Sequence, residues 1–137
     1  MTVVLALVGA EAEAVGAEVA RRLTGPAVVI PYDAMLTEWP VSPPDDSEAL
    51  AALTGQQAKL LCAGYVKAGY HVMLAGSFAR TPLEGPDDTQ IDAILRLMSM
   101  VPGVYAERAD LDPTLGHAAA ARQIVARLPI EGVASGD

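Results

Sequence analysis

The sequence predicts an α/β fold, a three-layer sandwich in which helices cover both faces of a parallel sheet of four to five strands. Short apolar runs rich in Val, Ile and Leu alternate along the chain with longer segments of helical periodicity. Such alternation is typical of strands joined by helical crossovers, and these crossovers make neighbouring strands parallel. The run at residues 3–8 is also continuous, without interleaved polar residues, which is expected where both faces of a strand are covered.

A strand and an amphipathic helix open the chain. Residues 3–8 form an unbroken apolar run and are predicted to be the first buried strand. Residues 11–23 place Val15, Val19 and Leu23 at spacings of four, which forms one apolar stripe along a helix. A Gly-Pro pair then ends this helix.

The next unit contains a longer connection. Residues 27–30 form a second short strand, and the proline-rich stretch at 38–46 is predicted to be a surface loop because prolines interrupt regular structure. Asp46 or Ser47 is expected to cap a long helix that extends to about residue 68. Four leucines of this helix are predicted to face the core: Leu50, Leu53, Leu60 and Leu61.

The second half of the chain repeats the pattern. Residues 71–77 are predicted to be a third buried strand and residues 104–109 a fourth. The helix between them begins near the acidic cluster at 87–89 and turns one apolar face inward. That face consists of Ile91, Ile94, Leu95 and Met98. The last helix is expected from Asp112 or Pro113 to about residue 128, and residues 130–133 are a candidate fifth strand.

The composition limits the number of domains and the kinds of partner. A chain of 137 residues supports one domain, assigned to residues 1–133, with residues 134–137 as a frayed tail. A formal charge of −8 makes nucleic acids and anionic membranes poor partners, because both attract clustered Lys and Arg. The single cysteine, Cys62, has apolar neighbours and is predicted to be an inert buried thiol. No targeting or membrane-spanning segment is recognised, so the expected location is cytoplasmic.

The predicted topology also indicates where a ligand would bind. Ligands of open parallel sheets bind beyond the carboxyl ends of the strands. This rule brings residues 9–16 after the first strand, Tyr32 and Asp33 after the second, and residues 77–80 after the third into one candidate cleft.

The order of the segments resembles that of a known family. The runs VVLALVG, ARRL, AVVIPYDAM and AGYVKAGYHVMLAGSF follow one another as strand, loop and helix, second strand with an acidic residue, long helix and third strand. In this order, roughly the first 80 residues resemble the small-molecule P-loop kinases. The resemblance implies a P-loop-kinase-like fold, and it implies that Asp33 contacts a substrate hydroxyl and acts as a base. Beyond Arg80, no Arg-rich lid segment of that family is recognisable.

The phosphate-binding motif of that family is degenerate in this chain. The pattern G-x-x-x-x-G-K-[ST] holds phosphates with backbone N–H groups and a lysine, and it holds magnesium with a hydroxyl. Counted from Gly9, its last three positions are Ala14, Val15 and Gly16. Counted so that Gly16 is the second glycine, the next two positions are alanine and glutamate. Neither register supplies a cation or a hydroxyl.

Other residues near the first turn also disfavour a nucleotide. Glu11 and Glu13 place negative charge where a triphosphate would lie, and such a repulsion is about 4 kcal/mol at about 4 Å and an effective dielectric of about 20. Both glutamates are expected instead to accept hydrogen bonds from free N–H groups at the start of the helix and to interact favourably with the positive end of its dipole. Ala75 stands where the resembled kinases commonly carry an aspartate that organises magnesium. These losses concern the nucleotide side of the cleft, whereas Asp33 on the substrate side is present.

The leading hypothesis is a degenerate P-loop-kinase-like domain that binds a small molecule or a protein partner in this cleft, without ordinary ATP-dependent phosphoryl transfer and without a cofactor or metal. The catalytic candidates are Asp33 and Arg80. The ligand-binding candidates are Gly9, Glu11, Glu13, Gly16, Tyr32, Trp39 and Ser77. Two alternatives stay open: an atypical ATP-dependent small-molecule phosphotransferase in which Arg80 replaces the lysine, and an enzyme of other acid/base chemistry that uses Asp33. The chain is also compatible with a homodimer.

Several candidates have a structural alternative. Asp33 can cap a short helix, and Arg80 can form a surface salt bridge with the acidic residues that follow it. Tyr32 and Trp39 can pack against the proline-rich loop. His117 lies among acidic residues, but the group lacks the regular spacing of metal ligands, so no metal site is assigned.

Overall fold

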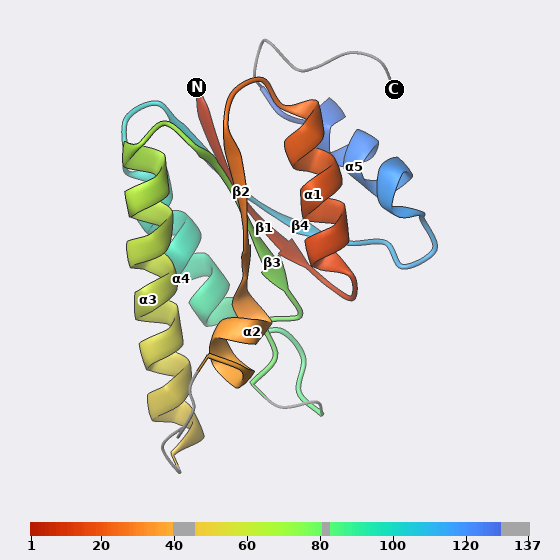
Figure 1. Cartoon of the computed structure of the whole chain (residues 1–137). Coiled ribbons are helices and arrows are strands. Elements are labelled where there is room, and N and C mark those ends of the chain that lie inside the picture. The colour runs from red at the N-terminus through yellow and green to blue at the C-terminus, as the bar shows by residue number, and fades with distance from the viewer. Residues whose placement is uncertain (40–45, 81–82, 130–137) are drawn as a thin grey trace.

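Strands and helices alternate along the chain, as Figure 1 shows. The computed structural model describes residues 1–39, 46–80 and 83–129. In chain order the elements are β1 (Thr2–Val8), α1 (Ala12–Arg22), β2 (Ala27–Pro31), α2 (Tyr32–Thr37), α3 (Ser47–Lys67), β3 (His71–Gly76), α4 (Asp88–Ser99), β4 (Val104–Asp110) and α5 (His117–Ala126). Most of the predicted loop at 38–46, the candidate strand at 130–133 and the tail at 134–137 lie outside the described residues.

All four strands run parallel, in the order β2-β3-β1-β4. The interior strand β1 pairs with β3 on one side and β4 on the other, so that Val4 lies beside both Val72 and Ala106. Helices α1 and α5 cover one face of the sheet, and α3 and α4 cover the other (Figure 1). The predicted α/β fold with a parallel sheet is confirmed, and the arrangement is consistent with three layers.

The continuous apolar run of β1 follows from this layering. Val3, Leu5 and Leu7 pack with residues of α1 and α5, whereas Val4 and Ala6 pack with residues of α3 and α4. All five side chains are at most 1% exposed. Because both faces are dry, a polar side chain at any of these positions would lose its hydration without gaining a partner.

The amino edge of the sheet is held by His71, the first residue of β3. Its Nδ1 accepts a hydrogen bond from the N–H of Val3 at 3.0 Å, so the ring proton lies on Nε2. Nε2 then donates to the carbonyl of Thr24 at 2.9 Å. This buried histidine thus ties β1 and the α1–β2 connection to β3.

The longest helix, α3, packs through small residues, which corrects one prediction. Its buried residues are Ala51, Thr54, Gly55, Ala58 and Cys62. Leu53 and Leu60 are 50% and 61% exposed, so the prediction that they face the core is wrong. Among the described residues, no helix has the length and apolar composition needed to cross a bilayer.

A tertiary contact uses the small face of α3 near its amino-terminal half. The side chain of Gln90, on α4, reaches across to α3 and donates to the carbonyl of Ala51 at 2.9 Å. A Cβ on Gly55 would overlap that side chain. The glycine therefore provides the space for this hydrogen bond between the two helices.

The helix starts agree with the predictions at α3 and α4 but not at α5. Asp46 accepts from two N–H groups at the start of α3, and Asp87 accepts from the N–H of Gln90 at the start of α4. The last helix begins at His117 and not at Asp112. Asp112 instead accepts from the N–H and hydroxyl of Thr114, which forms a turn before the helix.

Because the thiol of Cys62 is buried, the free energy of unfolding is expected to decrease as the pH becomes alkaline. Burial raises the pKa of Cys62 from 9.0 to about 12. The neutral thiol is the favoured form in the folded state, so its contribution is fully present below pH 9 and is lost as the pH rises toward 12.

We therefore expect the wild type to lose more stability between pH 8 and pH 10.5 than Cys62→Ala does, by about 1 to 2 kcal/mol. Urea unfolding at the two pH values measures this difference. Equal losses in the two proteins would contradict the assignment.

Candidate functional site

The candidate site lies at the carboxyl edge of the sheet, between β1 and β3. After β1 the chain crosses to the face covered by α1, whereas after β3 it crosses to the face covered by α4 (Figure 1). Adjacent strands whose connections leave to opposite faces form the crevice in which open α/β sheets bind ligands. The two turns touch, because the N–H of Gly9 donates to the carbonyl of Gly76 at 3.0 Å.

The turn after β1 is short. The motif that binds phosphate spans eight residues, but α1 already begins at Ala12, so residues 9–11 alone form the turn. Val15, at the lysine position, is 3% exposed and belongs to the core. Gly16, at the hydroxyl position, packs against the sheet, since a Cβ there would lie 3.3 Å from Val29 Cγ1. Both positions face the core and not the cleft.

The loop between β4 and α5 covers this turn. The N–H of Leu111 donates to the carbonyl of Val8 at 2.9 Å. A Cβ on Gly9 would lie 3.2 Å from the Cβ of Leu111, and the φ of Gly9 is +146°. The glycine thus allows the leucine to pack directly on the backbone of this turn.

A partly exposed side-chain pair borders the same region. His117 Nε2, at the start of α5, lies 3.1 Å from Glu11 Oε2. The remaining cavity has a volume of about 60 Å³ and is lined by these two residues together with Val15 and Leu111. That volume accommodates a few water molecules, each of which needs about 10–15 Å³ by this measure, and no nucleotide.

The glutamates of the turn differ from the prediction in one respect. Glu11 occupies the N-cap position of α1 with φ 59°, and its side chain makes no capping hydrogen bond. The prediction that it satisfies helix N–H groups is therefore wrong, because its carboxylate lies at His117. Glu13 is exposed in the first turn of α1, where a negative charge suits the helix dipole. Among the described residues, no group of three or more potential metal ligands is present.

Asp33 organises the turn after β3. Its Oδ2 accepts from the N–H of Ser77 at 2.7 Å, and its Oδ1 accepts from the N–H of Phe78 at 3.1 Å. Phe78 has a φ of 60°, a conformation that costs a non-glycine residue free energy. A Cβ on Gly76 would lie 2.7 Å from Asp33 Oδ1, so the aspartate packs tightly against the end of β3. Asp33 therefore caps a turn that is distant in sequence and does not cap its own helix.

Tyr32 is part of the core. It is 3% exposed and stacks on Phe78, with ring centroids 4.5 Å apart. Burial raises the pKa of Tyr32 to about 12, and the charges of Asp87 and Asp33 act in the same direction, while a hydrogen bond with Gln90 opposes them. Tyr32 thus packs against the turn that Asp33 holds, on the side of the turn that faces the core.

The remaining sequence candidates near the cleft have local partners. Arg80 Nε lies 3.7 Å from Asp87 and 3.9 Å from Glu84, which are long ion pairs on an exposed side chain. The Oγ of Ser77 accepts from the N–H of Ala79 at 3.3 Å. The predicted surface salt bridge of Arg80 with its acidic neighbours is present.

An ion cluster that involves residues of β4 was not predicted from the sequence. Arg108 contacts Asp110 through Nε and Nη2, and its Nη1 lies 2.7 Å from Asp88. The hydrogen bonds with Asp110, and to a lesser extent the one with Asp88, raise the pKa of Arg108. The signal that could have found part of this cluster is the spacing Arg-x-Asp, which places both side chains on one face of a strand.

A cavity between α2 and α3 contains Trp39. Its volume is about 250 Å³, and the lining residues are Met35, Trp39, Leu50, Leu53, Thr54 and Gln57. Trp39 is 55% exposed, and the Thr54 hydroxyl donates within its own helix to the carbonyl of Leu50. Trp39 was predicted as a ligand-binding residue, whereas the α3 residues were missed because a leucine-rich helix resembles a core helix in sequence.

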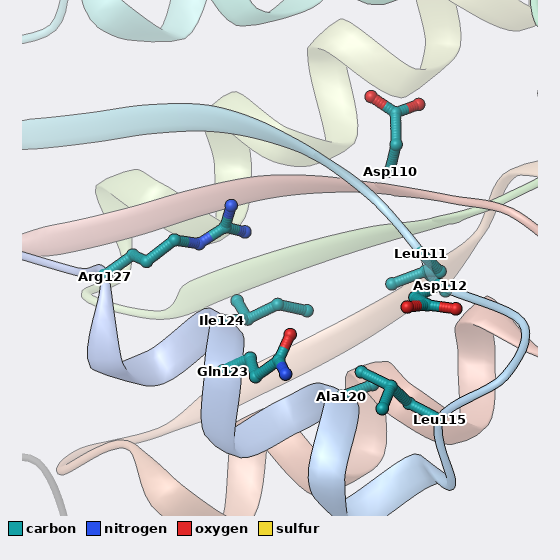
Figure 2. Close-up of a pocket in the computed structure, with 8 residues that line it drawn as sticks. All are labelled: Asp110, Leu111, Asp112, Leu115, Ala120, Gln123, Ile124 and Arg127. Carbon is teal, nitrogen blue, oxygen red and sulfur yellow. The ribbon is translucent and has the colours of Figure 1, made fainter.

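A further pocket lies between α5 and the β4–α5 loop. Figure 2 shows its lining residues, with Asp110 at the end of β4, Asp112 on the loop, and Gln123 and Arg127 on the helix side. Its volume of about 110 Å³ is smaller than the cavity of about 150 Å³ that accommodates benzene in another protein. The pocket is therefore too small for a nucleotide base with its ribose.

Comparison with models of protein families gives no match for the chain, and comparison with curated proteins also gives none.

Removing the Asp33 carboxylate is expected to destabilise the fold. Asp33→Ala leaves two N–H groups of a strained turn without their acceptor, and hydrogen bonds to charged groups contribute about 1.5–3 kcal/mol each. Asp33→Asn retains one acceptor oxygen and should lose about half as much. Urea unfolding measures both variants, and an Asp33→Ala protein as stable as the wild type would contradict this role.

The backbone at Glu11 gives a second test. The left-handed conformation costs a non-glycine residue about 1–2 kcal/mol, and glycine is free of that cost. Both Glu11→Gly and Glu11→Ala remove the contact with His117, so comparing them isolates the backbone term. We expect Glu11→Gly to be more stable than Glu11→Ala by about 1 kcal/mol in thermal unfolding. Two variants of equal stability would show that the turn has another conformation.

Proposed function

We propose that this protein is a degenerate P-loop-kinase-like domain that binds a small, largely apolar molecule between α2 and α3 and does not perform ordinary ATP-dependent phosphoryl transfer. The observation that carries the proposal is the occupied turn after β1. Leu111 packs on Gly9 and Glu11 contacts His117 at the position where a nucleotide's phosphates would lie. The cavity lined by Trp39, on the side of β2, is larger, with a volume of about 250 Å³ among the residues that the structure describes.

A nucleotide would have to disrupt several contacts in order to bind. Its phosphates would displace Leu111, which is half-buried, and exposing its apolar surface costs roughly 25 cal/mol per Å². They would also lie beside the carboxylate of Glu11, a repulsion of about 4 kcal/mol at about 4 Å and an intermediate dielectric. No lysine or hydroxyl of the motif is present to offset these costs.

The properties of the α2–α3 cavity favour a particular class of ligand. Its lining is mostly apolar, with Gln57 as an exposed polar group at the rim and Trp39 as an aromatic surface for stacking. A volume of about 250 Å³ exceeds the cavity of about 150 Å³ that accommodates benzene, so it suits a molecule of one or two rings. The net charge of −8 disfavours anions. The expected ligand is therefore an uncharged or cationic aromatic compound.

The catalytic alternatives receive less support from the geometry. Both oxygens of Asp33 accept backbone hydrogen bonds, so a role as a general base would compete with the turn that they hold. Arg80 lies beside Asp87 and Glu84, which reduce its net positive potential toward a phosphate. Neither residue is aimed into the cavity that contains Trp39, because neither lines it.

Isothermal titration calorimetry with Mg-ATP and with ADP tests the nucleotide part of the proposal. We expect no binding tighter than about 10 µM, because the phosphates have no cation and must displace Leu111. Binding of either nucleotide tighter than about 10 µM would contradict the proposal and favour an atypical phosphotransferase.

The ligand part can be tested with three probes that share one ring system. Trp39 is the only tryptophan, so its indole N–H gives a single resonance in a ¹H–¹⁵N spectrum. We expect saturable shifts of that resonance with indole and with tryptamine, and weaker shifts with indole-3-acetate.

Leu53→Asp should abolish the shifts with indole, which is uncharged, because it places a charge on the apolar cavity lining. Leu97→Asp alters an exposed leucine on α4 outside the cavity and serves as the matched control. Absence of a response to all three probes, or equal effects of the two substitutions, would contradict an aromatic ligand in this cavity.

A further inference from the structure

The outer face of α3 carries a regular series of exposed side chains. Its members follow one another at alternating spacings of three and four residues, and all of them are solvent-exposed. This α3 stripe consists of the N-cap residue Asp46, which directly precedes the helix, and of Ala49, Leu53, Gln56, Leu60, Ala63 and Lys67. Its two leucines are 50% and 61% exposed, which is unusual for large apolar side chains in the middle of a helix that packs well on its other face.

The spacing and the order of the stripe both indicate a helical partner. Alternation of three and four residues is the pattern of a seam between two packed helices. The order is also self-complementary: acidic, Ala, Leu, Gln, Leu, Ala and basic. If a second copy of the helix runs in the opposite direction, leucine meets leucine, alanine meets alanine, and each acidic end meets a basic end. A two-fold dimer requires such a surface, because the same patch is used by both copies.

We propose that two copies of this chain associate through antiparallel α3 helices, with a two-fold axis near Gln56. In this arrangement Leu53 packs on Leu60 of the partner subunit, and Asp46 lies near Lys67 of the partner subunit. The helix spans 21 residues, about 31 Å at 1.5 Å per residue, so the two charge pairs lie at opposite ends of the interface. The antiparallel direction also places the positive end of each helix dipole beside the negative end of the other.

The surface next to the stripe extends this interface. A shallow apolar groove of about 350 Å³ borders the carboxyl-terminal half of α3, and its lining residues are Leu60, Leu61, Gly64, Tyr65, Ala68 and Tyr70. Tyr65 and Tyr70 contact each other edge to face, with centroids 5.4 Å apart, and form one wall. The amino-terminal half of the partner helix would cover this groove and exclude water from it.

The charge distribution favours a second copy over an unrelated acidic or basic helix. Lys67 is one of only two lysines in the chain, and it stands at the end of the stripe opposite Asp46. A helix pair of this length buries less than the roughly 1,200–2,000 Å² of a standard stable interface. The dimer is accordingly of micromolar affinity or weaker, so it must be sought at high protein concentration.

Sedimentation equilibrium of the full chain, from about 10 µM to 1 mM, tests the proposal. Leu60→Gln removes an apolar contact at the centre, and Lys67→Glu replaces the end pair with a repulsion. We expect each to weaken self-association by about tenfold or more.

Matched controls are Met100→Gln, an exposed apolar residue on another segment, and Lys59→Glu, which makes the same charge change on the same helix outside the stripe. All four sites are on the surface, and far-UV circular dichroism checks that each variant is folded. Leu53 also lines the ligand cavity, so it is not used here, and the outcome is separable from that of the ligand test.

Cross-linking gives an independent measurement of the register. Gln56→Cys places a thiol near the two-fold axis, and Cys62 is buried and unreactive in the folded protein. A short bismaleimide should join two Gln56→Cys chains, whereas Gln123→Cys, on α5, should remain uncoupled. A monomer at every concentration would overturn the proposal, and so would a dimer that Leu60→Gln and Lys67→Glu do not weaken.

Discussion

The contact between Leu111 and Gly9 is the constraint on which the rest of this site depends. It exists because Gly9 has no side chain and adopts a backbone conformation that other residues rarely take. With the leucine in place, the β4–α5 loop follows the end of β1, and α5 begins where His117 can reach Glu11. Side chains of the β4–α5 loop and of α5 thereby lie against the turn after β1.

A second constraint acts on the neighbouring turn. Asp33 follows β2, yet its carboxylate fixes the backbone after β3, where Phe78 adopts a left-handed conformation. Phe78 in turn provides the surface on which Tyr32 stacks. An acidic residue that the resemblance to kinases associates with substrate therefore has a structural task here. The open space on this side of the molecule lies farther out, between α2 and α3, beside Trp39.

The strands and most helix ends could be predicted from sequence because they depend on local patterns. Continuous apolar runs identified strands covered on both faces, and Asp46 and Asp87 marked helix starts through hydrogen bonds to nearby N–H groups. The orientation of α3 could not be predicted in this way, because hydrophobicity favoured the leucines whereas the space available favoured the small residues. At Gly55 this space is occupied by Gln90, a side chain from another helix that is distant in sequence.

The same distinction applies to the candidate site. The sequence predicted which turns would meet at the carboxyl edge, since topology alone determines that. It could not predict that Glu11 would contact His117 instead of capping its helix, or that Asp33 would bind N–H groups 44 and 45 residues away. Those partners are distant in the chain, and only the fold brings them together.

The most direct measurement of the central claim is a crystal structure of the protein soaked with magnesium and a non-hydrolysable ATP analogue. Our expectation is that Leu111 remains packed on Gly9 and that no phosphate density appears in the turn after β1. A nucleotide seated in that turn, with Leu111 displaced and Glu11 separated from His117, would contradict it.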